Sequence, residues 1–171
     1  MNVYTIRLNI LNSHKKTIIA VYLKQLKPSI KIVAVESEES ACFIKAKEAG
    51  QPTELDSVGI FADGVAVKVM GQETFRLCNR LVDETLTVTN DEICGAIKDI
   101  FDDTRVIAEP AGALSVAAIR KYVKQHNLKG KKLGGILCGA TGGGREGRRG
   151  QSKGGQAREG LRPLVRGART S

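Results

Sequence analysis

One stretch, from Val106 to Ala140, limits the possible folds of this chain more than any other, because it joins a helix to a short apolar segment. Pro110 occupies a favourable first-turn position of the helix, and the carboxylate of Glu109 stands directly before it. After a polar hinge, the apolar residues 133–137 predict a buried strand that ends at Cys138. Open α/β sheets present ligands at the carboxyl ends of their strands. We therefore expect a ligand site near Glu109 and Cys138.

Hydrophobic patterning predicts that helices and strands alternate along the rest of the body. β-Branched residues between Ile30 and Val35 are typical of a strand buried on both faces. Thr89 and Glu92 form a capping box that marks the start of a helix. Residues 20–27 are expected to be the end of a helix, and further helices are expected over 37–49, 72–82 and after Thr89. Strands are expected over 3–6, 30–35, 86–88 and 133–137. This alternation favours a parallel sheet with helices packed on it.

Shorter patterns indicate where single residues belong. Gly50 is placed to end a helix in the left-handed conformation, and Asp63-Gly64 between apolar residues indicates a turn. Lys68 between two valines allows a buried Schiff-base lysine, but an exposed lysine on an edge strand is the favoured interpretation. Apolar residues at intervals of three and four predict one buried helix stripe, formed by Ile93, Ala96, Ile97, Ile100 and Phe101.

Charge and composition divide the chain into three parts. The formal net charge is +9, but residues 1–19 hold three basic residues and no acids, and residues 142–171 hold eight basic residues and two acids. The body, residues 20–141, has equal numbers of basic and acidic residues, so the net charge of the chain says little about what the body binds. We expect an atypical leader over 1–19, one catalytic-type domain over 20–141 and a disordered Gly/Arg-rich tail over 142–171. The tail's triple glycine lacks the following helix that a phosphate loop requires.

Cysteine usage and hydropathy exclude several classes of protein. The four cysteines are widely spaced and the chain has two histidines, so the clustered ligands of a zinc site are absent. Free thiols are typical of a reducing compartment. No apolar run approaches the ~20 residues needed to span a bilayer, and the leader lacks the Arg and Ser richness of a transit peptide. We expect a cytoplasmic protein without membrane contact.

Six sequence blocks, in order and at matching spacing over some 120 residues, resemble one enzyme family. They resemble the carboxyl-terminal part of the catalytic domain of biosynthetic threonine dehydratases, also called threonine ammonia-lyases, which are pyridoxal-phosphate enzymes. The blocks are Lys24–Pro28 with Val33–Glu36, Phe61–Lys68, Glu73–Cys78, Thr89–Cys94, Glu109–Ala113 and Ile136–Ala140.

The resemblance implies a fold, a cofactor and a reaction. The fold is part of the fold-type II, tryptophan synthase β-like domain, a mostly parallel three-layer αβα arrangement. The cofactor is pyridoxal 5'-phosphate, and the family lyases convert L-threonine to 2-oxobutanoate and ammonia in isoleucine biosynthesis. L-Serine is the alternative substrate, and full-length members are homo-oligomers.

The resemblance also assigns three cofactor-binding candidates. Cys138 matches the small Ser or Cys whose side chain faces the pyridine nitrogen. An uncharged partner there leaves that nitrogen largely unprotonated. The pyridine ring then withdraws electrons less strongly, which suits β-elimination. Glu109 matches a glutamate at the pocket edge, and Gly64 lies in a loop close to the ring. Taken alone, Glu109 is explained by the helix dipole and Cys138 by burial as a small apolar residue.

A metal site is not expected from the same comparison of residues. Glu36 and Ser40 match positions that bind a cation in related racemases, which makes them weak candidates. The third position of that pattern is an Asp in the racemases, and here it is Cys42.

Departures from the family pattern predict a fragment that is inactive alone. The family's Schiff-base lysine and its substrate-carboxylate loop find no match in this sequence, so no catalytic residue is assigned. Ser13–Thr17 stand where the phosphate-binding glycine tetrad is expected, and Thr141 stands in place of an Asn. The alternative hypothesis is a noncatalytic protein that binds RNA through its Gly/Arg tail, although that tail has no aromatic residue for base stacking and nucleic acid is the less favoured partner.

Overall fold

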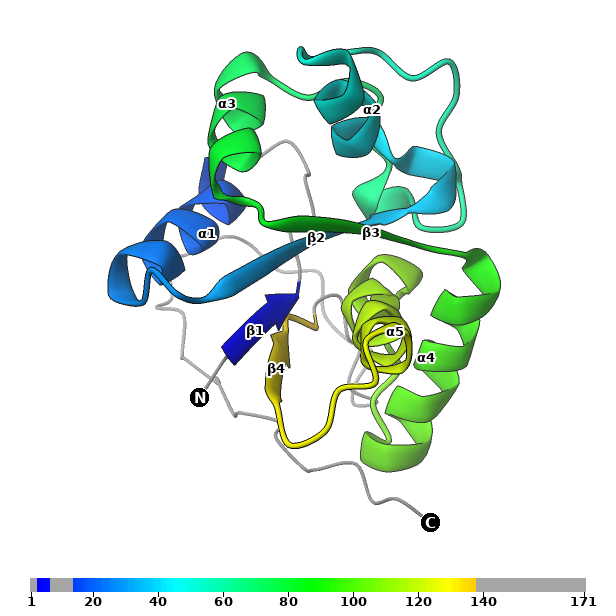
Figure 1. The fold of residues 1–171 in the computed structure, drawn as a ribbon. Helices are drawn as coiled ribbons and strands as arrows, with labels where there is room; N and C mark the ends of the chain where they lie inside the picture. The colour runs from blue at the N-terminus through cyan, green and yellow to red at the C-terminus, as the bar shows by residue number, and fades with distance from the viewer. Residues whose placement is uncertain (1–2, 7–13, 138–171) are drawn as a thin grey trace, which may run out of the picture.

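The computed structural model of the chain describes residues 3–6 and 14–137, and these form a three-layer α/β fold (Figure 1). At its centre is a four-stranded sheet with strand order β3-β2-β1-β4. The strands are β1 (Val3–Ile6), β2 (Lys31–Ser37), β3 (Glu84–Val88) and β4 (Lys132–Gly135). All three pairings are parallel, which confirms the sheet type predicted from the alternation of elements.

Helices cover both faces of this sheet (Figure 1). One layer contains α1 (His14–Leu26), α2 (Cys42–Ala49) and α3 (Gln72–Leu81), and the other contains α4 (Asn90–Thr104) and α5 (Pro110–Gln125). Two single-turn 3-10 helices, η1 (Glu38–Ser40) and η2 (Asp63–Val65), lie in the connections. None of the helices in the described part of the chain is both long and apolar enough to cross a membrane.

Strand β2 is buried on both faces, as its run of apolar residues predicts. Ile32 and Ala34 pack in the core beneath α1, α2 and α3. Val33 and Val35 alternate with them and pack in the core beneath α4 and α5. The two hydrophobic cores are therefore separated by the sheet and joined through one strand.

Two helix boundaries follow the predicted local chemistry. The Thr89 side chain accepts a hydrogen bond from the Glu92 amide at 3.2 Å, and the Thr89 amide donates to Glu92 Oε2 at 2.9 Å. Gly50 ends α2 with φ of +71°, and its amide donates to the carbonyl of Lys47 at 3.3 Å. The capping box and the glycine stop are both confirmed.

The strand expected over 133–137 is present, but its predicted burial was wrong. β4 lies at an edge of the described sheet, and its residues are exposed or half-buried. Ile136, directly after it, is 42% exposed. The apolar pattern could not distinguish an interior strand from an edge strand, because that difference depends on the order of strands in the sheet.

Three further local predictions need correction. Phe101 is not part of the buried stripe of α4, because the residue is 42% exposed and its ring lies beneath the guanidinium of Arg105. The helix expected from residue 37 begins at Cys42, after the 3-10 turn η1. Lys68 lies in a bend rather than an edge strand, and its ammonium pairs with Glu54 at 3.0 Å.

Thr89→Ala should lower the free energy of unfolding by about 1 kcal/mol, because the amide of Glu92 then loses its acceptor at the start of α4. Urea denaturation monitored by circular dichroism measures the change. Thr53→Ala is the control, since that hydroxyl bonds only to the nearby carbonyl of Gln51. Equal losses in the two variants would contradict the capping role.

Candidate functional site

The amino terminus of α5 carries the first candidate residue, Glu109. Its backbone is extended, with φ of −70° and ψ of 157°, and Pro110 follows as the first helical residue. The Glu109 carbonyl accepts the amide of Ala113 at 3.0 Å, but its carboxylate makes no capping hydrogen bond to the helix. The Glu109 side chain is exposed, and its carboxylate does not cap the helix that it precedes.

Gly64 lies directly against this helix start. A Cβ atom at Gly64 would stand 2.8 Å from the Cβ of Ala111 and 3.8 Å from Glu109 Oε1. The first distance is shorter than real carbon contacts allow, so only glycine lets η2 approach α5 so closely. Residues 64 and 109, separated by 45 positions in the sequence, are therefore brought close together in the fold.

Cys138 lies outside the described residues, but the segment that leads to it is held by α5. The fully buried Ser115 donates a hydrogen bond from Oγ to the carbonyl of Ile136 at 2.8 Å. A Cβ at Gly135 would stand 3.2 Å from the Cβ of Ser115. Sequence reasoning missed Ser115, although a lone hydroxyl among the alanines of an apolar helix is a signal that such a bond exists.

Ion pairs fix α5 against its neighbouring helix. Lys121 Nζ lies 3.0 Å from Glu92 Oε2, and Arg120 pairs with Asp99. Because α5 contacts both η2 and β4, it is the element that positions the candidate site.

Glu36, at the carboxyl end of β2, is buried and accepts hydrogen bonds from the first turn of α2. Its two oxygens accept the amides of Phe43 at 2.9 Å and Ile44 at 3.0 Å. Burial raises the pKa of the Glu36 carboxyl, and the two backbone hydrogen bonds offset only part of that rise. Burial, together with the charge of Glu36, raises the pKa of the Cys42 thiol to about 12.

These residues do not fit a cation. Both oxygens of Glu36 already accept amides of α2, and Ser40 Oγ accepts the amide of Gly59 at 3.0 Å. The raised pKa of the Cys42 thiol keeps it protonated. Within residues 3–6 and 14–137, no three side chains of His, Cys, Asp or Glu gather as metal ligands would.

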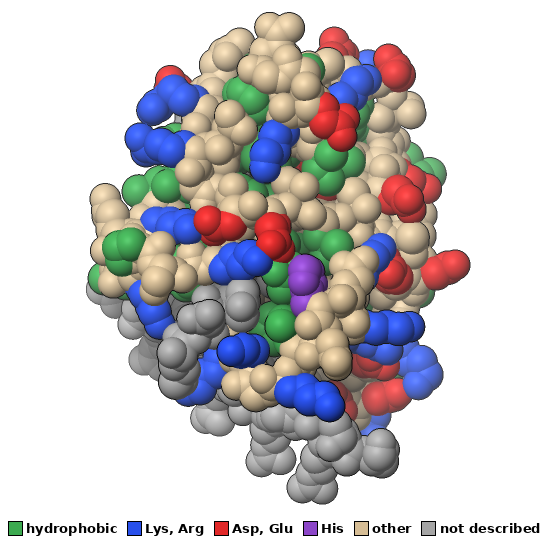
Figure 2. Space-filling model, viewed as in Figure 1, with side chains coloured by type: hydrophobic (Ala, Val, Ile, Leu, Met, Phe, Trp, Pro, Cys, Tyr) green, Lys and Arg blue, Asp and Glu red, His purple; other side chains and the backbone are tan. Residues whose placement is uncertain are grey.

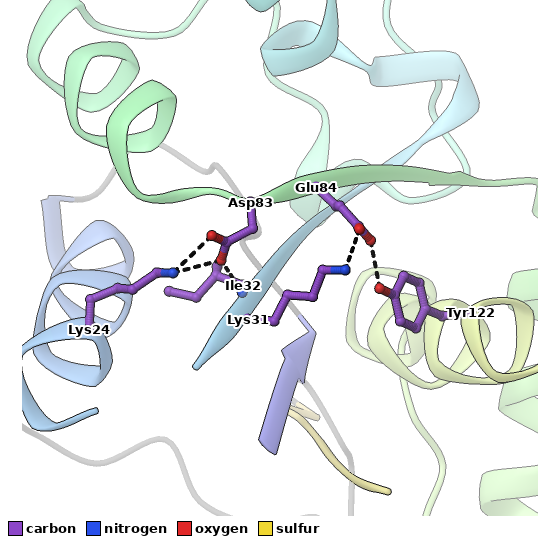
Figure 3. A network of polar contacts seen from close by, with 6 residues as sticks. All are labelled: Lys24, Lys31, Ile32, Asp83, Glu84 and Tyr122. Carbon is purple, nitrogen blue, oxygen red and sulfur yellow. Dashed lines mark hydrogen bonds and ion pairs between the residues drawn. The ribbon is translucent and has the colours of Figure 1, made fainter. Parts of the chain in front are cut away.

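A polar network lies at the amino-terminal ends of β2 and β3, the ends opposite to the one that carries Glu36 (Figure 3). Asp83 accepts the ammonium of Lys24 at 2.7 Å and the amide of Ile32 at 2.7 Å. Glu84 pairs with Lys31 and accepts the hydroxyl of Tyr122 at 2.6 Å. Burial opposes ionisation of Glu84, but the bonds from Lys31 and Tyr122 outweigh it and lower the pKa of that carboxyl.

The surface around this network carries mixed charge. Figure 2 shows acidic and basic side chains interspersed over much of this face, with apolar side chains between them. This mixture agrees with the equal numbers of basic and acidic residues in the body of the sequence.

Comparison with known proteins now identifies the family. The family described as "Pyridoxal-phosphate dependent enzyme" matches residues 18–139. This chain belongs to the pyridoxal-phosphate dependent enzyme family. The pyridoxal-phosphate enzyme family that the sequence blocks indicated is thereby confirmed.

The relatives in this family include biosynthetic L-threonine dehydratases. The protein of Pasteurella multocida is 57% identical over 123 residues, which cover 72% of this chain and 24% of that protein. The Escherichia coli protein is 53% identical over the same shares. A chloroplastic dehydratase of Solanum lycopersicum is 48% identical, over 72% of this chain and 20% of that protein. The chain thus spans about a quarter of the length of these relatives.

Solved structures of this family share the fold. The processed threonine deaminase isoform 2 of Solanum lycopersicum superposes with a TM-score of 0.76 at 32% identity, covering 84% of this chain and 41% of that one. Maize serine racemase gives a TM-score of 0.70 at 26% identity, covering 84% of this chain and 44% of that one.

Replacing Glu36 by Gln should change how stability depends on pH. A carboxyl group whose pKa is raised by folding stabilises the fold fully below its unfolded pKa, and this contribution is lost as the pH rises through the raised pKa. The free energy of unfolding of the unsubstituted chain, relative to Glu36→Gln, should therefore fall as the pH rises from 4 to 7. Denaturation at several pH values measures it, with Glu38→Gln as the control at an exposed position. Parallel curves for the two variants would contradict the assignment.

Proposed function

We propose that this chain is part of a pyridoxal-phosphate dependent threonine dehydratase, which converts L-threonine to 2-oxobutanoate and ammonia. The observation that carries the proposal is the identity of 50% or more to several biosynthetic L-threonine dehydratases over 72% of this chain, and the packing of Gly64 beside Glu109 places two of the candidate residues together. The identity of 57% to a biosynthetic L-threonine dehydratase supports the same reaction.

The residues on this side of the site fit the cofactor. The missing Cβ of Gly64 lets η2 pack against Ala111, which brings its backbone beside the Glu109 carboxylate, and that carboxylate makes no capping hydrogen bond to α5. We assign Gly64 and Glu109 to the edge of the cofactor pocket and Cys138 to the pyridine nitrogen. When bound, pyridoxal phosphate would supply the electron sink for β-elimination.

Several finer assignments belong to this proposal. The substrate is L-threonine, with L-serine as the alternative, and the complete protein is a homo-oligomer of the cytoplasm. The part assigned to the dehydratase domain is residues 20–141, and β1 (Val3–Ile6) and the start of α1 extend the same sheet and helical layer on its amino-terminal side. The alternative of RNA binding rests on the Gly/Arg-rich tail, which lies outside the described residues, and neither the rest of the chain nor the relatives favour it.

The 171-residue chain, mixed with pyridoxal phosphate and L-threonine, should release no 2-oxobutanoate. The resemblance provides no Schiff-base lysine in this sequence, and the remaining pocket residues cannot replace the covalent chemistry of that amine. Keto-acid release is followed by a coupled dehydrogenase assay. Release in proportion to the concentration of the chain would overturn the assignment of the chain as inactive alone.

A chimera tests the proposed reaction itself. Residues 18–139 replace the matching segment of the Pasteurella multocida dehydratase, and the chimera should release 2-oxobutanoate from L-threonine. Gly64→Ala in the chimera should lower kcat/KM at least tenfold, about 1.4 kcal/mol, because the new methyl group meets Ala111 and moves η2. Gly134→Ala is the matched control, since a Cβ there meets nothing within 4 Å. An inactive but folded chimera would contradict the proposed function.

A further inference from the structure

The segment from Leu55 to Lys68 is a closed loop that carries Gly64. Its ends are joined because the Leu55 amide donates to the Lys68 carbonyl at 2.8 Å. The ion pair of Lys68 with Glu54 at 3.0 Å reinforces this junction. A compact surface loop with adjoining ends is the form in which many proteins present binding groups. The loop therefore approaches the candidate site as one unit.

This loop is fastened to η1 at Gly59. The Gly59 amide lies 3.1 Å from the carbonyl oxygen of Glu39 and 3.0 Å from Ser40 Oγ, so one donor is shared by two acceptors. Ser40 is only 4% exposed, and its hydroxyl is held inside the protein. Gly59 is thus attached to the turn that directly follows β2.

The attachment depends on the absence of a side chain at residue 59. A Cβ at Gly59 would stand 2.6 Å from the Cβ of Glu39, an atom fixed by its own backbone. Glu39 is in turn linked to the start of α4, because Asn90 Nδ2 donates to its Oε1 at 3.1 Å. η1 therefore joins the end of β2, the loop and the beginning of α4.

Between Gly59 and Gly64 the chain is exposed at Ile60 and Phe61 and is buried again at Ala62. Ile60 is 90% exposed and Phe61 is 36% exposed, so this part of the loop gains little from burial. The next contacts are made by Ala62 and Val65, which pack into the core beneath α5. The place where Gly64 meets α5 is thus set from both sides, by these two residues and by the attachment at Gly59.

We propose that Glu39 and Ser40 are positioning residues for the candidate site. They hold Gly59, and through it they fix how closely Gly64 approaches Ala111 and Glu109, without contacting the site themselves. The functional meaning of this inference rests on the proposed cofactor-binding role of Gly64. The effect of Ser40 on the position of Ala111 concerns the described fold alone, so it is tested without the cofactor.

The experiment follows the methyl resonance of Ala111 in the full chain labelled with 13C-alanine, together with amide exchange of Val65. The Val65 amide bonds to the Ala62 carbonyl at 2.9 Å and therefore reports on η2. Gly59→Ala should shift the Ala111 methyl resonance and speed exchange at Val65 at least fivefold. Ser40→Ala should act in the same direction to a smaller extent, and it keeps the test available if Gly59→Ala fails to fold.

Gly71→Ala is the matched control, since a Cβ there meets only Thr74 Oγ1 at 3.9 Å. It should leave both readouts unchanged, and amide exchange in β2 should stay constant in all variants, which separates a local shift from general loss of stability. An Ala111 resonance that is unmoved in folded Ser40→Ala and Gly59→Ala would overturn the inference. Because no cofactor is present in this experiment, its failure is distinct from failure of the chimera, which tests the proposed reaction.

Discussion

Burial of β2 on both faces is the constraint on which the rest of this structure depends. Ile32 and Ala34 require helices on one side of the sheet, and Val33 and Val35 require helices on the other. Burying each of the larger aliphatic side chains contributes roughly 1.5–3 kcal/mol relative to its exposure. Parallel strands need crossover connections, and helices in those connections supply both covering layers. The three-layer arrangement follows from one strand that has no solvent face.

The candidate site follows from that arrangement and from small residues on α5. In a parallel sheet, each strand leads at its carboxyl end into a loop and a helix start, so separate segments converge there. α5 buries Ala111, Ala113, Ala117 and Ala118, and short side chains let neighbouring backbone approach. Gly64 meets Ala111 on one side, and Gly135 meets Ser115 on another. The site is therefore built from backbone held close to one helix, with Glu109 at its start.

The sequence predicted features that depend on neighbouring residues and missed those that depend on strand order. The burial of β2 was predicted correctly from its β-branched run, although such a run does not by itself give the order of strands. The Thr89 capping box and the Gly50 helix end could be read directly, because each is decided within a few residues. The exposure of β4 could not, since an apolar run looks the same at an edge and in the interior. The closeness of Gly64 to Glu109, the hydrogen bond of Ser115 and the attachment at Gly59 required three-dimensional contacts.

The polar contacts at the amino-terminal ends of the strands show how charged side chains act in this fold. Lys24 and Asp83 are partly exposed, and an ion pair of that kind contributes only about 0–1 kcal/mol. The same Asp83 carboxylate also accepts the amide of Ile32, a residue that is 1% exposed. A buried amide without an acceptor costs about 1–3 kcal/mol, so Asp83 stabilises the sheet mainly by completing the backbone pairing of β2. The polar side chains at the amino-terminal ends of β2 and β3 thus hold the strands in place.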